Sequence, residues 1–218
     1  MDPNLELMSL HTRKDYVKGT LDLSVLDSGP WKLLETWLND AIAADLPDPT
    51  AFALSTHDEH GYPHSRIVLL RDTRNGEVVF YTNYMSEKGL DLARNPKAGA
   101  TFFWPQLERQ IRMRGNVTRV SAEESDAYFH SRPRASQIGA WASNQSQGTT
   151  SREALDSQFQ ARSEEFGLGE VPRPEHWGGF ALRPVAIEFW QGRASRMHDR
   201  FRCERTPGGA WSVTRLQP

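Results

Sequence analysis

Cysteine, long apolar runs and the common cofactor-binding motifs are all scarce in this sequence. The single cysteine among 218 residues, Cys203, excludes an internal disulfide framework and any metal cluster built from cysteines. The longest apolar pieces are short, such as "RIVLL", far below the roughly twenty residues of a membrane-spanning helix. The opening "MDPNLELMSL" contains acidic residues and no apolar stretch, so it does not resemble a secretory signal. These features predict a cytoplasmic protein that does not associate with a membrane.

Charge of one sign is also lacking. Lys and Arg number 26 and Asp and Glu number 28, so the formal net charge is −2 and no basic field is available to bind nucleic acid. The dinucleotide fingerprint G-x-G-x-x-G after a strand, the P-loop and the G-x-S-x-G nucleophile elbow are absent. "HDEH" at 57–60 lies in a turn-forming stretch, so we interpret it as a hairpin turn and expect no metal site.

The order of the hydrophobic patterns predicts an α+β fold. Residues 1–27 are weakly periodic and are interpreted as a loosely held arm with one helical turn, and residues 28–218 as a single domain. "SGPWKLLETWLNDAIAADLPDP" predicts a helix with Pro30 in its first turn. Its expected apolar face consists of Trp31, Leu34, Leu38 and Ile42.

From Thr50 the apolar period changes to that of strands. "AFALSTHDEHGYPHSRIVLLRDTRNGEVVFYTN" predicts three strands joined by turns at "DEHG" and "TRNG". A short helix with Ser86 as N-cap and strands near 98–104 and 109–120 follow, and Ser121 and Glu124 have the spacing of a capping box.

The last third of the sequence returns to strands. "TSREALDSQFQARSEEF" predicts a helix, and "VPRPEHWGGF" a rigid connector. The final strands are expected at "AIEFWQG", "DRFRCER" and "AWSVTRLQ", the last two joined at Gly208 and Gly209. Antiparallel strands with helices at their ends predict a β-barrel rather than a parallel doubly wound sheet.

Three segments combine cations with hydroxyl or amide side chains. In "SRIVLLR", strand alternation places Arg66 on one face and Arg71 on the other, where they either snorkel at the surface or reach different anions. In "YTNYMSEK", a helix that begins at Ser86 holds Lys88 in its first turn, which suits an anion, although an ordinary capped helix has the same pattern.

The third segment is "YFHSRPRASQIGAWASNQSQ", residues 128–147. Tyr128, Arg132 and Ser136 are four residues apart, and Pro133 between them favours a turn between two short helices. Phenol, guanidinium and hydroxyl groups together are good phosphate donors, whereas the alternative is a helix end that happens to be basic.

A fourth cationic stretch, "EFWQGRASRMHDRF", surrounds a histidine with arginines. The neighbouring cations disfavour protonation of His198 unless an anion neutralises them. Together the four segments predict two separate phosphate sites beside aromatic walls, as a bound organic cofactor and a phosphorylated small molecule would require.

Five of these pieces, in this order, resemble the pyridoxine/pyridoxamine 5'-phosphate oxidase family. They are "SRIVLLR", "VVFYTN", "YFHSRPRASQIGAWAS", "EFWQG" and "RMHDRF", followed by a matching "RLQP" ending. The resemblance runs from about Arg13 to Pro218. It implies a mainly antiparallel split β-barrel with flanking helices that forms a homodimer, with FMN in the two inter-subunit clefts.

The resemblance also implies a role for each matching residue. The implied FMN contacts are Arg66, Ile67, Val68, Leu69, Leu70, Arg71, Tyr81, Thr82, Lys88, Gln110, Gln145, Ser146, Trp190 and Arg200. The last four of these would come from the other subunit. The implied substrate contacts are Arg13, Tyr16, Arg71, Tyr128, Arg132, Ser136, Arg196 and His198, with Arg196 and His198 over the pyridine ring as the catalytic candidates.

Two positions depart from the family pattern. Many members have a lysine where this chain has Arg71, which keeps the charge and adds bidentate reach. Many members also have a basic residue where Glu87 stands. A carboxylate in the first turn favours the helix and repels a phosphate, so we expect Glu87 to point to solvent and to weaken FMN binding.

The implied reaction is oxidation of pyridoxine or pyridoxamine 5'-phosphate at C4' by dioxygen, giving pyridoxal 5'-phosphate and hydrogen peroxide, with ammonia from the amine. The residues leave open whether His198 accepts a proton or only clamps the substrate by a hydrogen bond. Two alternatives also stay open, namely a related flavin oxidase acting on another ring, such as a phenazine precursor, and a non-catalytic flavin-binding barrel.

Overall fold

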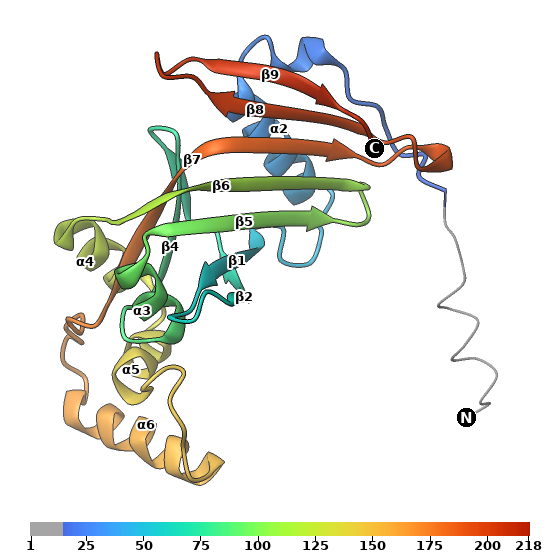
Figure 1. Cartoon of the computed structure of the whole chain (residues 1–218). Coiled ribbons are helices and arrows are strands. Elements are labelled where there is room, and N and C mark those ends of the chain that lie inside the picture. The colour runs from blue at the N-terminus through green and yellow to red at the C-terminus, as the bar shows by residue number, and fades with distance from the viewer. Residues whose placement is uncertain (1–14) are drawn as a thin grey trace, which may run out of the picture. The chain divides into compact units, whose positions relative to one another are not determined.

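A computed structural model describes residues 15–218, which form two compact units (Figure 1). One unit consists of residues 15–49, 103–111 and 187–218, and the other of residues 50–102 and 112–186. We refer to them as the terminal unit and the central unit. Arg13, a predicted substrate contact, lies outside the described residues.

The central unit holds most of the strands and four helices of the described chain. Its elements, in order, are β1 (Ala51–His57), β2 (Pro63–Leu69), β3 (Asp72–Arg74), β4 (Glu77–Asn83), α3 (Glu87–Arg94), β5 (Lys97–Trp104), β6 (Arg109–Arg119), α4 (Ala122–Ser131), α5 (Arg134–Ala142), α6 (Arg152–Phe166) and β7 (Trp177–Gln191). β5, β6 and β7 each also contribute residues to the terminal unit.

The terminal unit also holds helix, hairpin and short 3-10 segments. These are η1 (Leu23–Leu26), α2 (Pro30–Ala43), η2 (Ala194–Arg196), β8 (Asp199–Arg205) and β9 (Trp211–Leu216). The helical turn expected in the arm is η1, and the predicted C-terminal hairpin is β8 and β9, paired antiparallel. Among the described residues, no helix has the length and apolar character needed to cross a membrane.

The strands form one sheet in the order β2-β1-β5-β6-β7-β4-β3, and β8 pairs with β7 and β9. The pairs β1–β2, β1–β5, β3–β4 and β4–β7 are antiparallel, which confirms the predicted α+β class. In the register of β1 and β2, Leu54 lies opposite Arg66 and Thr56 opposite His64.

Aromatic side chains form the core of the central unit. The ring centroids of Phe52 and Phe102 are 5.0 Å apart, those of Phe52 and Phe80 are 5.9 Å apart, and all three side chains are fully buried. Such offset and edge-to-face contacts add to the free energy gained from burying the rings. This core supports the ends of β2 and β4, from which several site residues project.

One glycine in β7 is required by close packing. A Cβ atom on Gly179 would lie 2.6 Å from Val120 Cγ2 and 2.7 Å from Tyr81 Cε1. Gly179 lies opposite Tyr81 in the β4–β7 register, so the absent side chain leaves room for the tyrosine ring.

Two predicted elements need correction. The first helix buries Leu33, Trp37 and Ala41 in addition to Leu34 and Leu38, whereas Ile42 is 54% exposed and Trp31 is only half-buried. At about 100° per residue, Trp31 and Ile42 lie roughly 60° and 80° to one side of Leu34, whereas the buried Leu33, Trp37 and Ala41 lie to its other side. The predicted connector "VPRPEHWGGF" also extends too far along the chain, because β7 already begins at Trp177.

The "SRIVLLR" segment also differs from the prediction. β2 ends at Leu69, and β3 is a fourth strand that pairs with β4 around the "RNG" turn. Leu70 and Arg71 therefore lie between two strands, and Arg71 is held there by its backbone N–H, which donates to the Val79 carbonyl over 2.9 Å. Because Arg71 lies outside β2, strand alternation does not fix the direction of its side chain.

Candidate functional site

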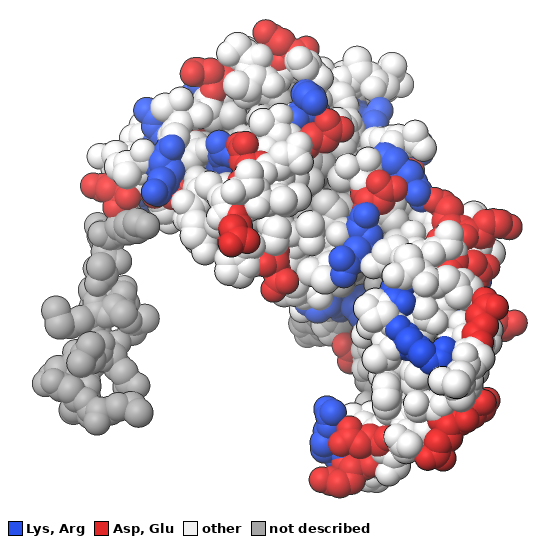
Figure 2. Space-filling model, turned by 180° about the vertical axis from the view of Figure 1, so that it is seen from behind, with Lys and Arg blue, Asp and Glu red and all other residues white. Residues whose placement is uncertain are grey.

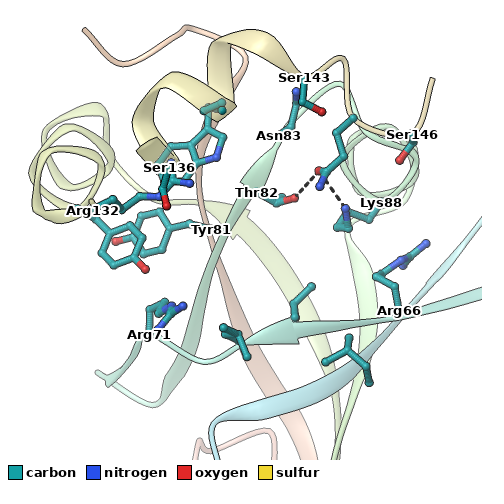
Figure 3. Close-up of a pocket in the computed structure, with 18 residues that line it drawn as sticks. Arg66, Arg71, Tyr81, Thr82, Asn83, Lys88, Arg132, Ser136, Ser143 and Ser146 are labelled. Carbon is teal, nitrogen blue, oxygen red and sulfur yellow. Dashed lines mark hydrogen bonds between the residues drawn. The ribbon is translucent and has the colours of Figure 1, made fainter. Parts of the chain in front are cut away.

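A cavity of about 640 Å³ opens in the central unit (Figure 3). Its walls come from the end of β2, the end of β4, the start of α3, the α4–α5 region, the loop after α5 and the start of β7. The lining residues are Arg66, Ile67, Val68, Leu69, Arg71, Tyr81, Thr82, Asn83, Lys88, Tyr128, Arg132, Ser136, Gly139, Ala140, Ser143, Gln145, Ser146 and Trp177.

Arg66 and Lys88 form the first cation pair of the cavity. Lys88 is 7% exposed, and its Nζ donates to Ser86 Oγ and to Gln145 Oε1, each over 3.2 Å. Thr82 Oγ1 donates to the same Gln145 oxygen over 3.2 Å. Burial, helped by the neighbouring charge of Arg66, lowers the pKa of Lys88 to about 8. Burial also lowers the pKa of Arg66.

Arg71 and Arg132 form the second cation pair, which Figure 3 shows on the other side of the cavity from the first. The Arg132 guanidinium carbon lies 4.4 Å from the centroid of the Trp177 ring. Its Nη1 atom is buried and has no hydrogen-bond partner among the described residues. Burial lowers the pKa of Arg132, and the charge of Arg71 lowers it further. A half-buried cation beside a like charge, with a buried and unused donor, favours an anionic ligand.

Three aromatic rings form a wall next to the second cation pair. Tyr81 and Tyr128 are stacked with ring centroids 3.8 Å apart and an interplanar angle of 19°. Trp177 is nearly parallel to Tyr128, at 6.2 Å and 4°. Burial raises the pKa of Tyr81, so this phenol is neutral at physiological pH. The wall offers a flat apolar surface with hydroxyl donors at its edge.

Local sequence explains why these groups meet. The capping box of Ser121 and Glu124 begins α4, with Ser121 Oγ accepting from Glu124 N over 3.2 Å. Arg132 is the C-cap of α4 in extended conformation, and Pro133 precedes α5. The predicted turn between two short helices is therefore confirmed, and it places Ser136 on the cavity with Arg132.

Most residues predicted for the FMN and substrate phosphates line this one cavity. They are Arg66, Ile67, Val68, Leu69, Arg71, Tyr81, Thr82, Lys88, Tyr128, Arg132, Ser136, Gln145 and Ser146. Leu70 is instead 7% exposed and does not line the cavity. Gln145 and Ser146 were expected from the other subunit, but the structure places both on the cavity of their own chain, where Gln145 contacts Thr82 and Lys88.

The remaining predicted residues belong to the terminal unit. Gln110 is half-buried on β6, and Arg200 donates from Nη2 to Glu188 Oε1 over 2.8 Å. Tyr16, Trp190 and His198 form an aromatic cluster, with the His198 ring 4.7 Å from Trp190 and 5.6 Å from Tyr16.

His198 has a defined tautomer when it is neutral. The Arg193 backbone N–H donates to His198 Nδ1 over 3.1 Å, which leaves the proton on Nε2. Partial burial, with the charges of Arg196 and Arg200, lowers the pKa of His198, so the ring is neutral at pH 7. Arg196 itself is exposed and has a φ of 60°, a strained conformation for a residue other than glycine.

Five lining residues were not predicted from the sequence. They are Asn83, Gly139, Ala140, Ser143 and Trp177. Trp177 carried a usable signal, because a tryptophan followed by two glycines is unusual in a connector, but "EHWGGF" was interpreted as rigid loop. The other four are small or common residues without a distinctive pattern.

Side chains of both charges are interspersed on the face drawn in Figure 2. Within residues 15–218, no group of three or more His, Cys, Asp or Glu side chains is placed to hold a metal ion.

Two family models match the chain. Residues 38–164 match the pyridoxamine 5'-phosphate oxidase model, and residues 177–218 match the pyridoxine 5'-phosphate oxidase C-terminal dimerisation region. The chain belongs to the pyridoxine/pyridoxamine 5'-phosphate oxidase family. This confirms the resemblance seen in the sequence and the prediction of an enzyme, and it supports a flavin cofactor.

Individual relatives agree with the family models. The pyridoxine/pyridoxamine 5'-phosphate oxidase of Paraburkholderia phymatum is 49% identical over 206 residues, which are 94% of this chain and 97% of the relative. The enzyme of the same name from Cyanothece sp. is 47% identical over 94% of this chain and 96% of its own.

Two solved structures have the same fold. PhzG from Burkholderia lata 383, in complex with tetrahydrophenazine-1-carboxylic acid, has a TM-score of 0.84 and 30% identity, covering 91% of this chain and 98% of its own. A pyridoxamine 5'-phosphate oxidase-related, FMN binding protein from Nostoc punctiforme has a TM-score of 0.70 at 18% identity, covering 87% and 98%. The predicted split-barrel fold class is thereby confirmed.

Proposed function

We propose that this chain is an FMN-dependent oxidase of pyridoxine 5'-phosphate or pyridoxamine 5'-phosphate. The product is pyridoxal 5'-phosphate, dioxygen is the electron acceptor, and hydrogen peroxide is released, with ammonia from the amine substrate. The observation that carries the proposal is a single cavity with two separate cation pairs, one for each of two phosphate groups.

The residues of the cavity fit FMN at the first cation pair. Arg66 and Lys88 are held on one side, both with a lowered pKa, and an anion would restore the charged form of Lys88. Thr82 and Gln145 add polar groups beside Lys88. When bound, FMN supplies the hydride acceptor that none of the twenty side chains provides.

The second cation pair fits the substrate phosphate. Arg132 presents an unused buried donor, Arg71 adds a second guanidinium, and Tyr128 and Ser136 line the same part of the cavity. Anchoring a phosphate there fixes one end of the substrate, and the wall of Tyr81, Tyr128 and Trp177 limits where its ring lies.

The aromatic cluster of the terminal unit completes the proposal through a second subunit. We propose a homodimer with FMN in inter-subunit clefts, in keeping with the family's C-terminal dimerisation region. Trp190 and Arg200 then reach the cofactor of the partner chain. The ring centroids of His198 and Trp190 are 4.7 Å apart. In the proposed dimer, His198 and Arg196 therefore reach the same partner site as Trp190.

His198 is suited to orient the substrate. Its neutral ring carries a proton on Nε2 and holds Nδ1 against the Arg193 backbone N–H, so Nε2 donates to an acceptor on the substrate. Arg196 adds a cation beside it. Tyr16 contacts both His198 and Trp190 and covers the His198 ring. Residues 1–27 remain a proposed arm attached to a single FMN-binding domain of residues 28–218.

One alternative has specific support. The chain is 30% identical to PhzG, which was solved in complex with tetrahydrophenazine-1-carboxylic acid, a ring compound that carries no phosphate. The second cation pair, with Arg132 Nη1 unpartnered, favours a phosphorylated substrate over this alternative.

The test is the visible absorption spectrum of the FMN-loaded protein mixed anaerobically with pyridoxine 5'-phosphate. We expect the flavin band to bleach, and to return in air while pyridoxal 5'-phosphate appears. Arg132→Ala is expected to keep the yellow flavin and to raise KM at least about tenfold through the loss of a charge-assisted hydrogen bond. A flavin that stays yellow with both phosphates but bleaches with a dihydrophenazine carboxylate would establish the alternative instead.

A further inference from the structure

Arg66 is fixed by a relay of buried groups on the side away from the cavity. Its Nη1 donates to Thr56 Oγ1 over 2.7 Å and to the Leu54 carbonyl over 3.4 Å. Thr56 is fully buried on β1, where it lies opposite His64 in the β1–β2 register. Both Nη1 protons are thereby used within the protein.

The relay ends at a buried carboxylate on α3. Thr56 Oγ1 donates its only proton to Asp91 Oδ2 over 2.7 Å, so it is left with lone pairs alone for Arg66. Asp91 is 3% exposed, and its Oδ2 lies 3.8 Å from Arg66 Nη2, which is beyond hydrogen-bond distance. Thr56 therefore lets Asp91 balance the charge of Arg66 without engaging Nη2.

We propose that Thr56 and Asp91 are positioning residues that hold Arg66 with Nε and Nη2 directed to a phosphate. Among residues 15–218, neither of these two nitrogens donates a hydrogen bond. A direct two-bond contact between Arg66 and a carboxylate would use the same edge of the guanidinium that a phosphate needs. The inference rests on the proposed function, because it takes the phosphate to be that of FMN.

A second arginine and a histidine also face Asp91. Arg94, on α3 itself, has Nη1 3.7 Å from Oδ1, and His64 on β2 has Nδ1 3.5 Å from Oδ2. His64 Nδ1 is buried without a hydrogen-bond partner, so it is a spectator to the relay in this geometry. The hydrogen-bonded path from Asp91 to Arg66 runs only through Thr56 among the described residues.

The experiment compares binding of FMN with binding of riboflavin, which lacks the phosphate. Thr56→Val keeps the shape of the side chain and removes the hydroxyl, and we expect it to weaken FMN binding about tenfold, the worth of one charge-assisted hydrogen bond. Riboflavin binding should not change. Thr56→Ser should keep the wild-type preference for FMN, and Asp91→Leu should lose it as Thr56→Val does.

A double-mutant cycle tests whether Thr56 acts through Arg66. In an Arg66→Met background, adding Thr56→Val should leave the ratio of riboflavin to FMN dissociation constants unchanged, because the group it positions is gone. Thr101→Val is the matched control, since Thr101 lies on neighbouring β5, pairs with Ala53 and does not line the cavity. Circular dichroism and riboflavin binding confirm that each variant is folded.

The contrary results have separate meanings. If Thr56→Val weakens FMN and riboflavin binding equally, or has its full effect in the Arg66→Met background, the positioning role is wrong. The positioning role is also wrong if Arg66→Met abolishes the preference for FMN over riboflavin while Thr56→Val leaves that preference unchanged. If the wild-type protein binds riboflavin as tightly as FMN, the proposed phosphate site at Arg66 and Lys88 fails, and this inference fails with it.

Discussion

At the scale of single residues, the ionisation of Lys88 links cofactor binding to pH. Its pKa is lowered to about 8 by burial and by the charge of Arg66, and a bound phosphate raises it again. We therefore predict that FMN binding takes up close to one proton above pH 8 and little at pH 7. FMN affinity should fall as pH rises through 8, because the free protein then holds Lys88 neutral and binding must protonate it.

Titration calorimetry in two buffers of different ionisation enthalpy measures this proton uptake. Lys88→Met is the control, since it should remove the uptake as well as part of the affinity. The stability of the cofactor-free protein depends on pH in the opposite direction. The unfolded chain binds more protons than the folded one between pH 8 and about 10.4, so the free energy of unfolding should rise over that range. An FMN affinity that is constant from pH 7 to 9 would contradict the assignment of Lys88 to the phosphate.

Glu87, for which the resemblance implies a basic residue in many members, lies next in sequence to Lys88 of the proposed phosphate site. It is exposed in the first turn of α3, as expected, and its charge still acts on both Arg66 and Lys88. We predict that Glu87→Arg strengthens FMN binding by roughly two- to fivefold at low salt, the range of an exposed charge pair, and less at high salt.

The matched control for Glu87 is Glu153→Arg. Glu153 occupies the first turn of α6, is exposed and does not line the cavity, so the same charge reversal should leave FMN binding unchanged. Fluorescence quenching of FMN at two salt concentrations gives the dissociation constants. Equal affinity of wild type and Glu87→Arg at low salt would show that this position has no part in cofactor binding.

At the scale of elements, the sequence predicts what depends on local chemistry. The capping box at Ser121, the break at Pro133 and the hairpin at Gly208 and Gly209 are each determined by a few adjacent residues, and each is found where expected. Ser86 is only partly as expected. It is the N-cap of α3, but its hydroxyl donates to the Asn83 carbonyl over 2.6 Å and does not cap the helix.

Elements whose limits depend on tertiary packing are predicted less well. β7 extends to Trp177 because its first residues pair with β4, with Gly179 opposite Tyr81, and no local pattern in "EHWGGF" reveals that partner. Arg71 lies outside β2 for a similar reason, since a backbone bond to Val79 on β4 ends the strand. Because these strand boundaries depend on pairing between distant segments, local sequence patterns predict them less accurately.

The same distinction applies to the site. Cationic residues such as Arg132 and Lys88 are recognisable in the sequence because their clustering is unusual in a chain of net charge −2. Trp177 and Asn83 reach the cavity only through the fold. The relay through Thr56 and Asp91 was not recognisable either, since its members are 35 residues apart and separately look like ordinary strand and helix residues.

At the scale of the whole molecule, the proposed active site needs two chains. The two cation pairs lie in the central unit, whereas His198, Trp190 and Arg200 belong to the terminal unit, whose C-terminal strands fall in the matched dimerisation region. In the proposed homodimer, each site combines the cavity of one subunit with His198 of its partner. Substitutions in these two sets should then complement each other.

We predict that mixing two impaired variants, Arg132→Ala and His198→Ala, raises activity at substrate concentrations far below the wild-type KM, where the raised KM of Arg132→Ala leaves about a tenth of wild-type activity or less. After subunit exchange at equal concentrations, half of the dimers contain one subunit of each kind, and each such dimer has one site with both residues intact. The expected activity is about a quarter of wild type. Steady-state oxidation of pyridoxine 5'-phosphate before and after mixing measures it.

The double variant distinguishes complementation from a simple sum of residual activities. The double variant carries Arg132→Ala and His198→Ala on one chain and is mixed with wild-type subunits. Each mixed dimer then has one site that lacks Arg132 and one site that lacks His198. That mixture should therefore retain about half of the wild-type activity before exchange and about a quarter after it. If mixing the two single variants instead leaves their activity unchanged while native mass spectrometry of differently tagged subunits shows that they have exchanged, Arg132 and His198 serve the same site from one chain, and the inter-subunit arrangement is wrong.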